Sequence, residues 1–252
     1  MRARLRLVVP CYNEAGRLNV DAFLQLANTR CDTALLFVDD GSTDATPTVL
    51  AGLASRAGGK VTVLRLPDNA GKAAAVQRGI LMAMQQGAEL VGYWDADLST
   101  PLAALPAFLE VFEERPEVDI VTGARVKLLG RRIDRNAVRH YCGRMFATAA
   151  SLVLEVAVYD TQCGAKIFRV NDAVRQTFAA PFRSRWIFDV EILARYIAAT
   201  GAGSAASRIY ELPLAEWSDV PGSKLNVRQA ARAVWDLGLI WRRRTPQSGD
   251  DA

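Results

Sequence analysis

Short apolar runs alternate with segments of helical periodicity through the first half of the chain. The apolar runs span residues 5–10, 34–40, 61–66, 89–97 and 119–123, and helical patterns lie near residues 43–57, 72–87 and 101–114. Several of the runs are too uniformly apolar for strands that expose one face to solvent. This alternation predicts an α/β domain with a mostly parallel, Rossmann-like sheet and helices on both of its faces.

Polar clusters follow three of the predicted strands. They are PCYNE at residues 10–14, DDGSTD at residues 39–44 and DADLST at residues 95–100. The carboxyl ends of parallel strands meet at one edge of a sheet, and ligands of such sheets bind there. We therefore expect the three clusters to form one site.

The DDGSTD cluster has two interpretations. Gly41 permits a tight turn, and Ser42 or Thr43 can cap the next helix, so the cluster fits an ordinary loop between a strand and a helix. That loop does not account for the paired carboxylates Asp39 and Asp40, which can accept hydrogen bonds from a ribose or a base edge. The residues alone leave both interpretations open.

In DADLST, Asp95 and Asp97 are one residue apart, which places both side chains on the same side of a strand, facing one cation. Oxygen ligands suit Mg²⁺ or Mn²⁺, and Mg²⁺ commonly takes one or two carboxylates plus substrate phosphates. A turn or helix cap is the alternative, since Pro101 stands where the next helix begins. The two other acidic clusters at the same predicted edge favour the metal site.

Lys72 stands at the start of a helical pattern, directly after Asn69 and Gly71. There it can pair with a phosphate, which the N-terminus of the helix also attracts. The segment lacks the spacing of a P-loop, and a solvated lysine is the alternative.

Composition narrows the classes of partner and site. Of 252 residues, 50% are apolar and 23% are charged, as in ordinary globular proteins, and the net charge is only +4. With acidic clusters on the predicted edge, this charge argues against a nucleic-acid partner. The four cysteines form no CxxC pair and there is one histidine, so we expect no thiolate or imidazole metal site and a cytosolic setting. No apolar stretch approaches the roughly 20 residues of a membrane span.

Two later segments are basic. Residues 124–144 carry seven Arg or Lys side chains against the single Asp134, and Arg132, Arg135 and Arg139 recur at helical spacing. Residues 221–244 have the pattern of a basic amphipathic helix with tryptophans, followed by a tail at residues 245–252 that we expect to be flexible. Each segment fits either an ordinary helix face or a surface for phosphate or anionic membrane. One domain over residues 1–220 is the simplest organisation.

The motifs VVPCYNEAGRL, VDDGSTDAT, NAGKAAAVQRGI and DADLSTP are followed by TGAR, YDTQCGAKIF, RWIFDVEIL and GSKL. In this order the chain resembles glycosyltransferase family 2 enzymes of the GT-A fold, and most of all the dolichyl-phosphate (polyprenyl-phosphate) β-glucosyltransferases, with the mannosyl-transferring enzymes as relatives. The resemblance implies a nucleotide-sugar half at residues 1–123 and an acceptor half at residues 124–220.

The resemblance also implies roles for individual residues. It implies that Asp95 and Asp97 hold Mg²⁺ or Mn²⁺ on the donor diphosphate and that Arg125 and Arg139 grip the acceptor phosphate. The implied donor-binding residues are Pro10, Tyr12, Asn13, Glu14, Asp39, Asp40, Gly41, Lys72, Asp95, Ala96 and Asp97. The implied catalytic residues are Asp95, Asp97, Asp189 and Arg125.

Asp189 and Glu191 match an acidic motif on the acceptor side, which the family uses as a catalytic base or a positioning group. A phosphate monoester has a second pKa of about 6, so the attacking phosphate is largely ionised at neutral pH. A strong base is then dispensable, and we favour positioning for Asp189.

The function implied is a metal-dependent, inverting transfer of glucose from UDP-glucose to a polyprenyl phosphate. GDP-mannose or another nucleotide sugar as donor, a non-lipid acceptor, and a non-catalytic nucleotide-binding module are the alternatives. Eukaryotic glucosyl members carry an N-terminal anchor that this sequence does not show, so we expect peripheral docking on the cytoplasmic face of a membrane. The sequence leaves the oligomeric state open.

Overall fold

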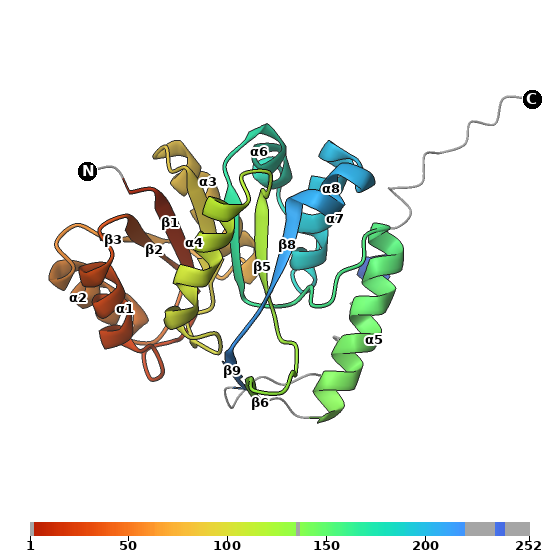
Figure 1. Cartoon of the computed structure of the whole chain (residues 1–252). Coiled ribbons are helices and arrows are strands. Elements are labelled where there is room, and N and C mark those ends of the chain that lie inside the picture. The colour runs from red at the N-terminus through yellow and green to blue at the C-terminus, as the bar shows by residue number, and fades with distance from the viewer. Residues whose placement is uncertain (1–2, 135–136, 220–234, 240–252) are drawn as a thin grey trace, which may run out of the picture.

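The computed structural model of the chain describes residues 3–134, 137–219 and 235–239, with the backbone alone at residues 137–140. In this part of the chain the centre is a seven-stranded sheet in the order β3-β2-β1-β4-β7-β5-β8 (Figure 1). Its strands are β1 (Leu5–Cys11), β2 (Thr33–Asp39), β3 (Val61–Arg65), β4 (Leu90–Trp94), β5 (Ile120–Ala124), β7 (Ala165–Arg169) and β8 (Ile209–Pro213). Only β7 runs antiparallel to its neighbours, so the predicted mostly parallel sheet is confirmed.

Helices cover both faces of the sheet. They are α1 (Val20–Thr29), α2 (Thr46–Arg56), α3 (Lys72–Gln85), α4 (Leu105–Glu114), α5 (Ala137–Leu154), α6 (Asp172–Ala179), α7 (Phe188–Thr200) and α8 (Ala202–Arg208). Strand β1 shows how the layers form, because Leu7 and Val9 pack with α1, α2 and α4 while Val8 packs with α3 and α7. All three side chains are fully buried, as the uniformly apolar run predicts.

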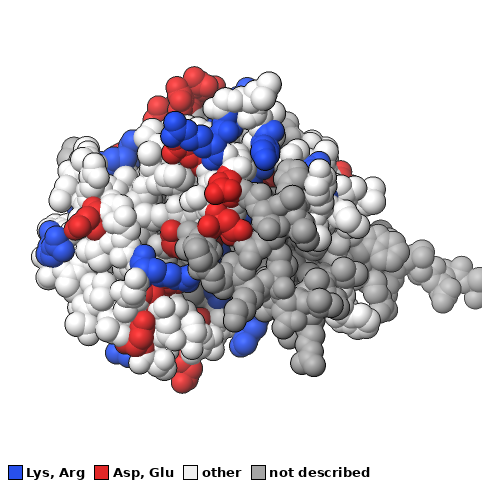
Figure 2. Space-filling view, turned by 90° about the horizontal axis from the view of Figure 1, so that it is seen from below, with Lys and Arg blue, Asp and Glu red and all other residues white. Residues whose placement is uncertain are grey.

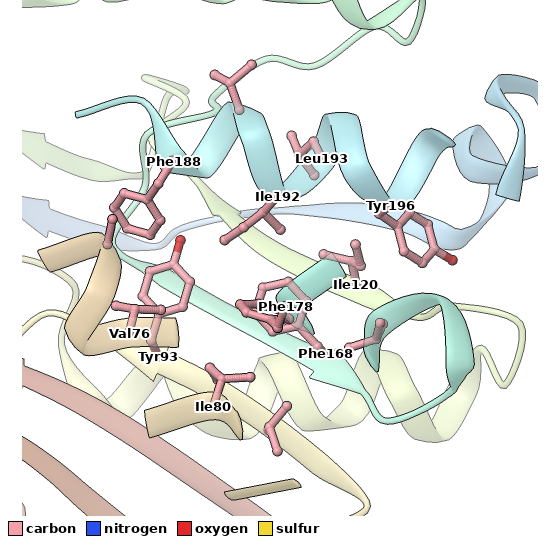
Figure 3. Packing of buried hydrophobic residues seen from close by; sticks show 14 of the residues in the cluster. Val76, Ile80, Tyr93, Ile120, Phe168, Phe178, Phe188, Ile192, Leu193 and Tyr196 are labelled. Carbon is pink, nitrogen blue, oxygen red and sulfur yellow. The ribbon is translucent and has the colours of Figure 1, made fainter. Parts of the chain in front are cut away.

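The face that carries α3 and α7 brings aromatic side chains under the edge of the sheet where β1, β2 and β4 end. Tyr93, at the end of β4, lies between Val76 of α3 and Phe188 of α7 (Figure 3), and its ring centre is 5.9 Å from that of Phe188. Further back, Phe168 of β7 and Phe178 of α6 meet edge to face at 5.2 Å. This rigid packing fixes the first turn of α7 against the end of β4.

Two local expectations are wrong. Arg132 lies not on a helix but on β6 (Arg132–Asp134), which pairs in parallel with β9 (Glu216–Ser218), and its guanidinium is 3.5 Å from Glu216. Helix α5 begins only at Ala137. Helix α2 has Ala45 at its N-cap with no capping side chain, so neither Ser42 nor Thr43 caps it.

The basic helix expected at residues 221–244 lies largely outside the described residues, as does the tail at 245–252. Residues 235–239 are helical, Leu237 is buried, and the Ser184 hydroxyl donates to Asp236 Oδ2 at 2.6 Å. None of the described helices is long and apolar enough to cross a membrane.

Candidate active site

A cleft of about 340 Å³ opens at the carboxyl ends of β1, β2 and β4. It is called the main cleft below, and its lining residues are Pro10, Cys11, Tyr12, Glu14, Arg17, Asp40, Asn69, Gly71, Lys72, Ala75, Asp95, Ala96 and Asp97. The three polar clusters thus meet, as expected. Among the described residues, the implied donor-binding residues that do not line the cleft are Asn13, Asp39 and Gly41.

The paired carboxylates of DDGSTD shape the walls of the main cleft. Asp40 accepts the backbone N–H groups of Ala70 at 2.9 Å and of Gly71 at 2.7 Å, and buried Asp39 accepts that of Ser42 at 3.0 Å. Gly41 has a φ of +68°, and a Cβ there would come within 2.6 Å of the Asp68 backbone. Local bonding therefore accounts for the acidic pair. Contact of either residue with a uracil or ribose stays a prediction, and only Asp40 reaches the cleft.

Residues that follow β1 form hydrogen bonds with the loop that follows β2. Asn13 has a φ of 53°; its side-chain oxygen accepts the Thr43 N–H at 2.9 Å, and its own N–H donates to the Ser42 hydroxyl at 3.0 Å. Glu14 is buried and forms a two-point ion pair with Arg17, which the sequence analysis did not select. Arg17 is a second cationic side chain in the lining of the cleft, and its hydrogen bond to Glu14 raises its pKa, with Asp97 and Asp95 adding to the rise.

Lys72, which the sequence predicts at the start of a helix, is the first residue of α3 and contacts Asp95 of the acidic pair directly. Lys72 Nζ lies 2.5 Å from Asp95 Oδ1, and both side chains are partly exposed to the cleft. Burial alone would lower the pKa of Lys72, but Asp95 and Asp189 outweigh it and the pKa is raised. Burial likewise raises the pKa of Asp95 against the opposing effect of Lys72, and the neighbouring Asp97 adds to the rise.

A glycine far away in the sequence holds Asp95 in place. The Asp95 N–H donates to the Gly164 carbonyl at 2.9 Å, and a Cβ built on Gly164 would collide with the Asp95 carboxylate. Gly164 belongs to residues 160–166, which lead from the segment after α5 into the first two residues of β7 and are called the 160–166 loop below. The motif YDTQCGAKIF contained this glycine, but only the fold places it against Asp95.

The residues present fit a divalent cation whose remaining ligands come from a substrate. Strand β4 ends at Trp94, so a turn, not strand alternation, carries Asp95 and Asp97 into the same cleft. Asp95 Oδ1 is buried and has no hydrogen-bond donor apart from its ion pair with Lys72. Within the described ranges, no group of three or more His, Cys, Asp or Glu side chains could hold a metal alone. Two carboxylates plus substrate phosphate oxygens are a usual donor set for Mg²⁺.

Asp189 lies in a buried network beneath the cleft. Its Oδ1 accepts both the Tyr93 hydroxyl and Lys166 Nζ, the latter at 2.6 Å. Lys166 is fully buried, and its ammonium also donates to the carbonyls of Thr161 at 3.1 Å and Cys163 at 2.7 Å. Three bonds use all the donors of an ammonium group. The Asp189–Lys166 pair therefore braces the 160–166 loop, and sequence reasoning did not select Lys166.

Glu191 serves a separate loop. Its Oε2 accepts the N–H groups of Arg183 at 3.0 Å and Ser184 at 3.2 Å, and its Oε1 accepts Arg195 at 2.7 Å. These bonds hold the segment that leads into α7. Of the two acidic residues, Asp189 alone connects to the main cleft through Tyr93 and the 160–166 loop.

Arg125, an implied acceptor-phosphate residue, is tied to Asp160. Nε and Nη2 of Arg125 donate to the two carboxylate oxygens of Asp160 at 2.6 and 2.7 Å, and 11% of the arginine side chain is exposed. Although burial opposes the shift, Arg125 lowers the pKa of Asp160 to about 2. Glu211 accepts the N–H of Asp160 and fixes the other side of the loop. The side chain of Arg139 lies outside the described residues.

Charges of both signs therefore gather at this edge of the sheet. Figure 2 views that side of the molecule and shows Asp or Glu side chains next to Lys or Arg side chains near the middle of the face. Such an arrangement can hold a diphosphate through cations while carboxylates bind a metal.

Comparison with known proteins gives one family. The sequence model of the family described as "Glycosyl transferase family 2" matches residues 7–174 of the chain. The chain is 33% identical to dolichyl-phosphate beta-glucosyltransferase of Drosophila melanogaster, over 95% of this chain and 74% of that protein. It is 32% identical to the Homo sapiens protein of the same name, over 88% of this chain and 69% of that protein.

Solved structures share the fold. Glucosyl-3-phosphoglycerate synthase from Mycobacterium tuberculosis, in complex with Mn²⁺, UDP and glucosyl-3-phosphoglycerate, aligns with a TM-score of 0.68 at 15% identity, over 98% of this chain and 82% of that one. Its complex with Mn²⁺ and UDP-glucose aligns with a TM-score of 0.68 at 18% identity, over 98% and 81% of the two chains.

Proposed function

Because the chain belongs to glycosyl transferase family 2 and is a glycosyltransferase of the GT-A fold, we propose that it transfers glucose from UDP-glucose to a polyprenyl (dolichyl-type) phosphate. The observation that carries the proposal is the main cleft, where Asp95 and Asp97 lie beside Lys72 at the carboxyl ends of the parallel strands. The names of the most similar relatives, which are dolichyl-phosphate beta-glucosyltransferases, support this donor sugar and acceptor class.

The donor half of the reaction follows from the lining of the cleft. Tyr12 has 44% of its surface exposed at the mouth, where its ring can stack on a base. Lys72 and Arg17 supply cations for the two phosphates. Asp95 and Asp97 would hold Mg²⁺ or Mn²⁺, which would supply further positive charge to the leaving diphosphate. The Mn²⁺ present in the similar folds supports a divalent cation of this kind.

The transfer itself requires alignment more than proton removal. An oxygen of the acceptor phosphate attacks the anomeric carbon of glucose, the bond to UDP breaks, and UDP leaves with the electron pair. The phosphate is ionised at neutral pH, so no base has to remove a proton. Asp189 is already bonded to Tyr93 and to Lys166, which suits a positioning residue. Attack on the face opposite UDP converts the α-linkage to a β-linkage, so the transfer inverts.

The surface beside the acceptor half suits a lipid interface. Large apolar side chains are exposed on the loop before β6 and along α5, a helix that extends away from the end of the molecule where β6 and β9 lie (Figure 1). They are Leu128, Leu129, Tyr141, Met145 and Leu152. Apolar residues four and seven positions apart share one helix face, and basic residues lie close to them in the chain. These features support docking on a membrane surface, and the free cysteines agree with its cytoplasmic side.

Transfer from radiolabelled UDP-glucose to farnesyl phosphate, with Mn²⁺ or Mg²⁺, tests the proposal. Asp97→Ala should abolish transfer, whereas Asp172→Ala, which removes an exposed carboxylate in the first turn of α6, should not. Full transfer by the Asp97→Ala variant would refute the assignment of Asp97 as a metal ligand. Binding of UDP without transfer to any acceptor would indicate a non-catalytic module.

The donor and acceptor alternatives need a binding screen. UDP-glucose, GDP-mannose and UDP-N-acetylglucosamine are each added with Mn²⁺, and the unfolding temperature is measured, because a ligand of the folded state raises stability with its occupancy. A larger rise in the unfolding temperature with GDP-mannose would identify GDP-mannose as the donor in place of UDP-glucose. Transfer to a small phosphorylated acid in preference to farnesyl phosphate would replace the lipid acceptor.

A further inference from the structure

A second, smaller pocket adjoins the 160–166 loop and is called the small pocket. Its volume is about 40 Å³, and it is lined by Arg125, Gly143, Arg144, Phe146, Tyr159, Asp160, Thr161 and Gln162. This volume exceeds the about 10–15 Å³ that a cavity needs to hold one water, so the pocket has room for a small polar group. The same loop borders both cavities, because Gly164 contacts Asp95 in the main cleft while residues 160–162 line the small pocket.

Buried donors without partners gather in this pocket. Among the described residues, five buried side-chain atoms lack a hydrogen-bond partner, and three of them are carbonyl or carboxylate oxygens that only accept. The remaining two can donate: the Thr161 hydroxyl and the Gln162 Nε2 amide. Both line the small pocket, and Thr161 is 99% buried, with 1% exposure. A buried donor left without an acceptor is costly, so its retention calls for a ligand.

The charge of the small pocket selects an anion. Arg125 directs Nε and Nη2 to Asp160, which compensates that carboxylate. Arg144 uses one N–H on the Tyr159 carbonyl at 2.9 Å and stacks on the Tyr159 ring at 3.6 Å. A guanidinium group has five N–H donors, so both arginines retain others. Among the side chains that line the pocket, one positive charge therefore remains after the Arg125–Asp160 pair, next to two unpartnered donors.

We propose that Thr161 and Gln162, together with Arg144, bind the phosphate group of the acceptor and make the enzyme select a phosphorylated acceptor. The inference rests on the proposed function for the identity of the acceptor, and the ligand chemistry is a phosphate monoester. Gln162 and Gly164 are two residues apart, so their Cα atoms are at most about 7 Å from each other. The small pocket is therefore next in the chain to the glycine that contacts Asp95 in the main cleft.

The Thr161→Val variant separates binding from folding. Valine keeps the shape of threonine and removes a buried hydroxyl that has no partner, so the unfolding temperature should stay unchanged or rise. The KM for farnesyl phosphate should nevertheless rise about tenfold, which is usual for one hydrogen bond to a charged group, while the KM for UDP-glucose stays unchanged. Gln162→Met should raise the acceptor KM in the same way.

Thr177→Val is the matched control. Thr177 is equally buried, but its hydroxyl donates to the Ala173 carbonyl at 2.9 Å inside α6, away from both cavities. Its replacement should lower the unfolding temperature and leave both KM values unchanged. The two valine variants thus predict opposite patterns of stability and affinity.

Calorimetric binding in the presence of UDP and Mn²⁺ distinguishes the source of the phosphate. The probes are farnesyl phosphate, farnesol and glycerol 3-phosphate, and we expect the two phosphates to bind and Thr161→Val to weaken both. Unchanged phosphate affinity in both pocket variants, or equal binding of farnesol and farnesyl phosphate, overturns the pocket assignment even if transfer to farnesyl phosphate stands. If glycerol 3-phosphate binds through Thr161 while no prenyl phosphate is glucosylated, the proposed function fails and the pocket assignment holds.

Discussion

Asp189→Asn tests whether this carboxylate braces the 160–166 loop or removes a proton. In the native protein the Asp189 carboxylate compensates the Lys166 ammonium, which is wholly buried and bonded to two backbone carbonyls. Asparagine has nearly the same shape but no charge. The substitution therefore leaves a buried cation without its counter-ion.

The cost can be worked out from this geometry. Removing one partner of a buried ion pair costs about 3–5 kcal/mol, because the remaining charge keeps its desolvation penalty. For a chain of this length, 1 kcal/mol moves the unfolding temperature by about 2–4 °C, so we expect a fall of about 6–20 °C. Replacing both partners at once, by Lys166→Met with Asp189→Leu, should recover most of this stability, because no buried charge remains.

The assay combines chemical unfolding with kcat/KM from pH 5.5 to 9. A positioning role predicts lower stability, reduced transfer, and an acidic limb that still follows ionisation of the acceptor phosphate near a pKa of about 6. The double variant should fold well yet transfer poorly, since the 160–166 loop has lost the bonds from Lys166. Asp189→Asn with native stability, more than about a hundredfold loss of kcat and no acidic limb would refute this reasoning and identify a general base.

Two further predictions concern the same loop. Gly164→Ala should reduce transfer about a hundredfold without unfolding the protein, because its Cβ would displace the Asp95 carboxylate, whereas Gly203→Ala, where the space is open, should have no effect in the same assay. The fall of the pKa of Asp160 from 3.8 to about 2 makes its pair with Arg125 stabilising by about 2–3 kcal/mol above pH 3.8, and this stability should be lost as the pH falls through 2. Urea unfolding at several pH values should show a flatter acid dependence for Asp160→Asn, and an unchanged slope would contradict the assignment.

The strands and their order along the chain were predictable from the sequence. The runs expected at residues 5–10, 34–40 and 61–66 became β1, β2 and β3 with shifts of about one residue at the ends. Uniform burial on both faces leaves a continuous apolar run, which is a local signal. The position of β7 was not predictable, because it inserts antiparallel between β4 and β5 through contacts about 75 residues apart in the sequence.

The candidate site likewise contains residues that the sequence predicts and contacts that it does not. Asp95 and Asp97 were selected because three polar clusters follow strands whose carboxyl ends meet at one edge of a parallel sheet, and Lys72 because it stands where a helix begins. Asp39 and Asp40 also followed a strand, but their bonding to loop N–H groups depends on how neighbouring loops meet. The pattern of apolar and polar residues does not predict which loops contact each other.

The sequence by itself determined the α/β class, the edge of the sheet at which the main cleft opens, and the acidic pair and lysine that meet in that cleft. Only the tertiary structure decided that Gly164 supports Asp95, that buried Lys166 pairs with Asp189, and that the donors of Thr161 and Gln162 share a pocket. The physical reason is the range of the interactions. Burial and turn formation act between near neighbours, whereas a buried charge or an unpartnered donor is defined by groups that folding brings from distant parts of the chain.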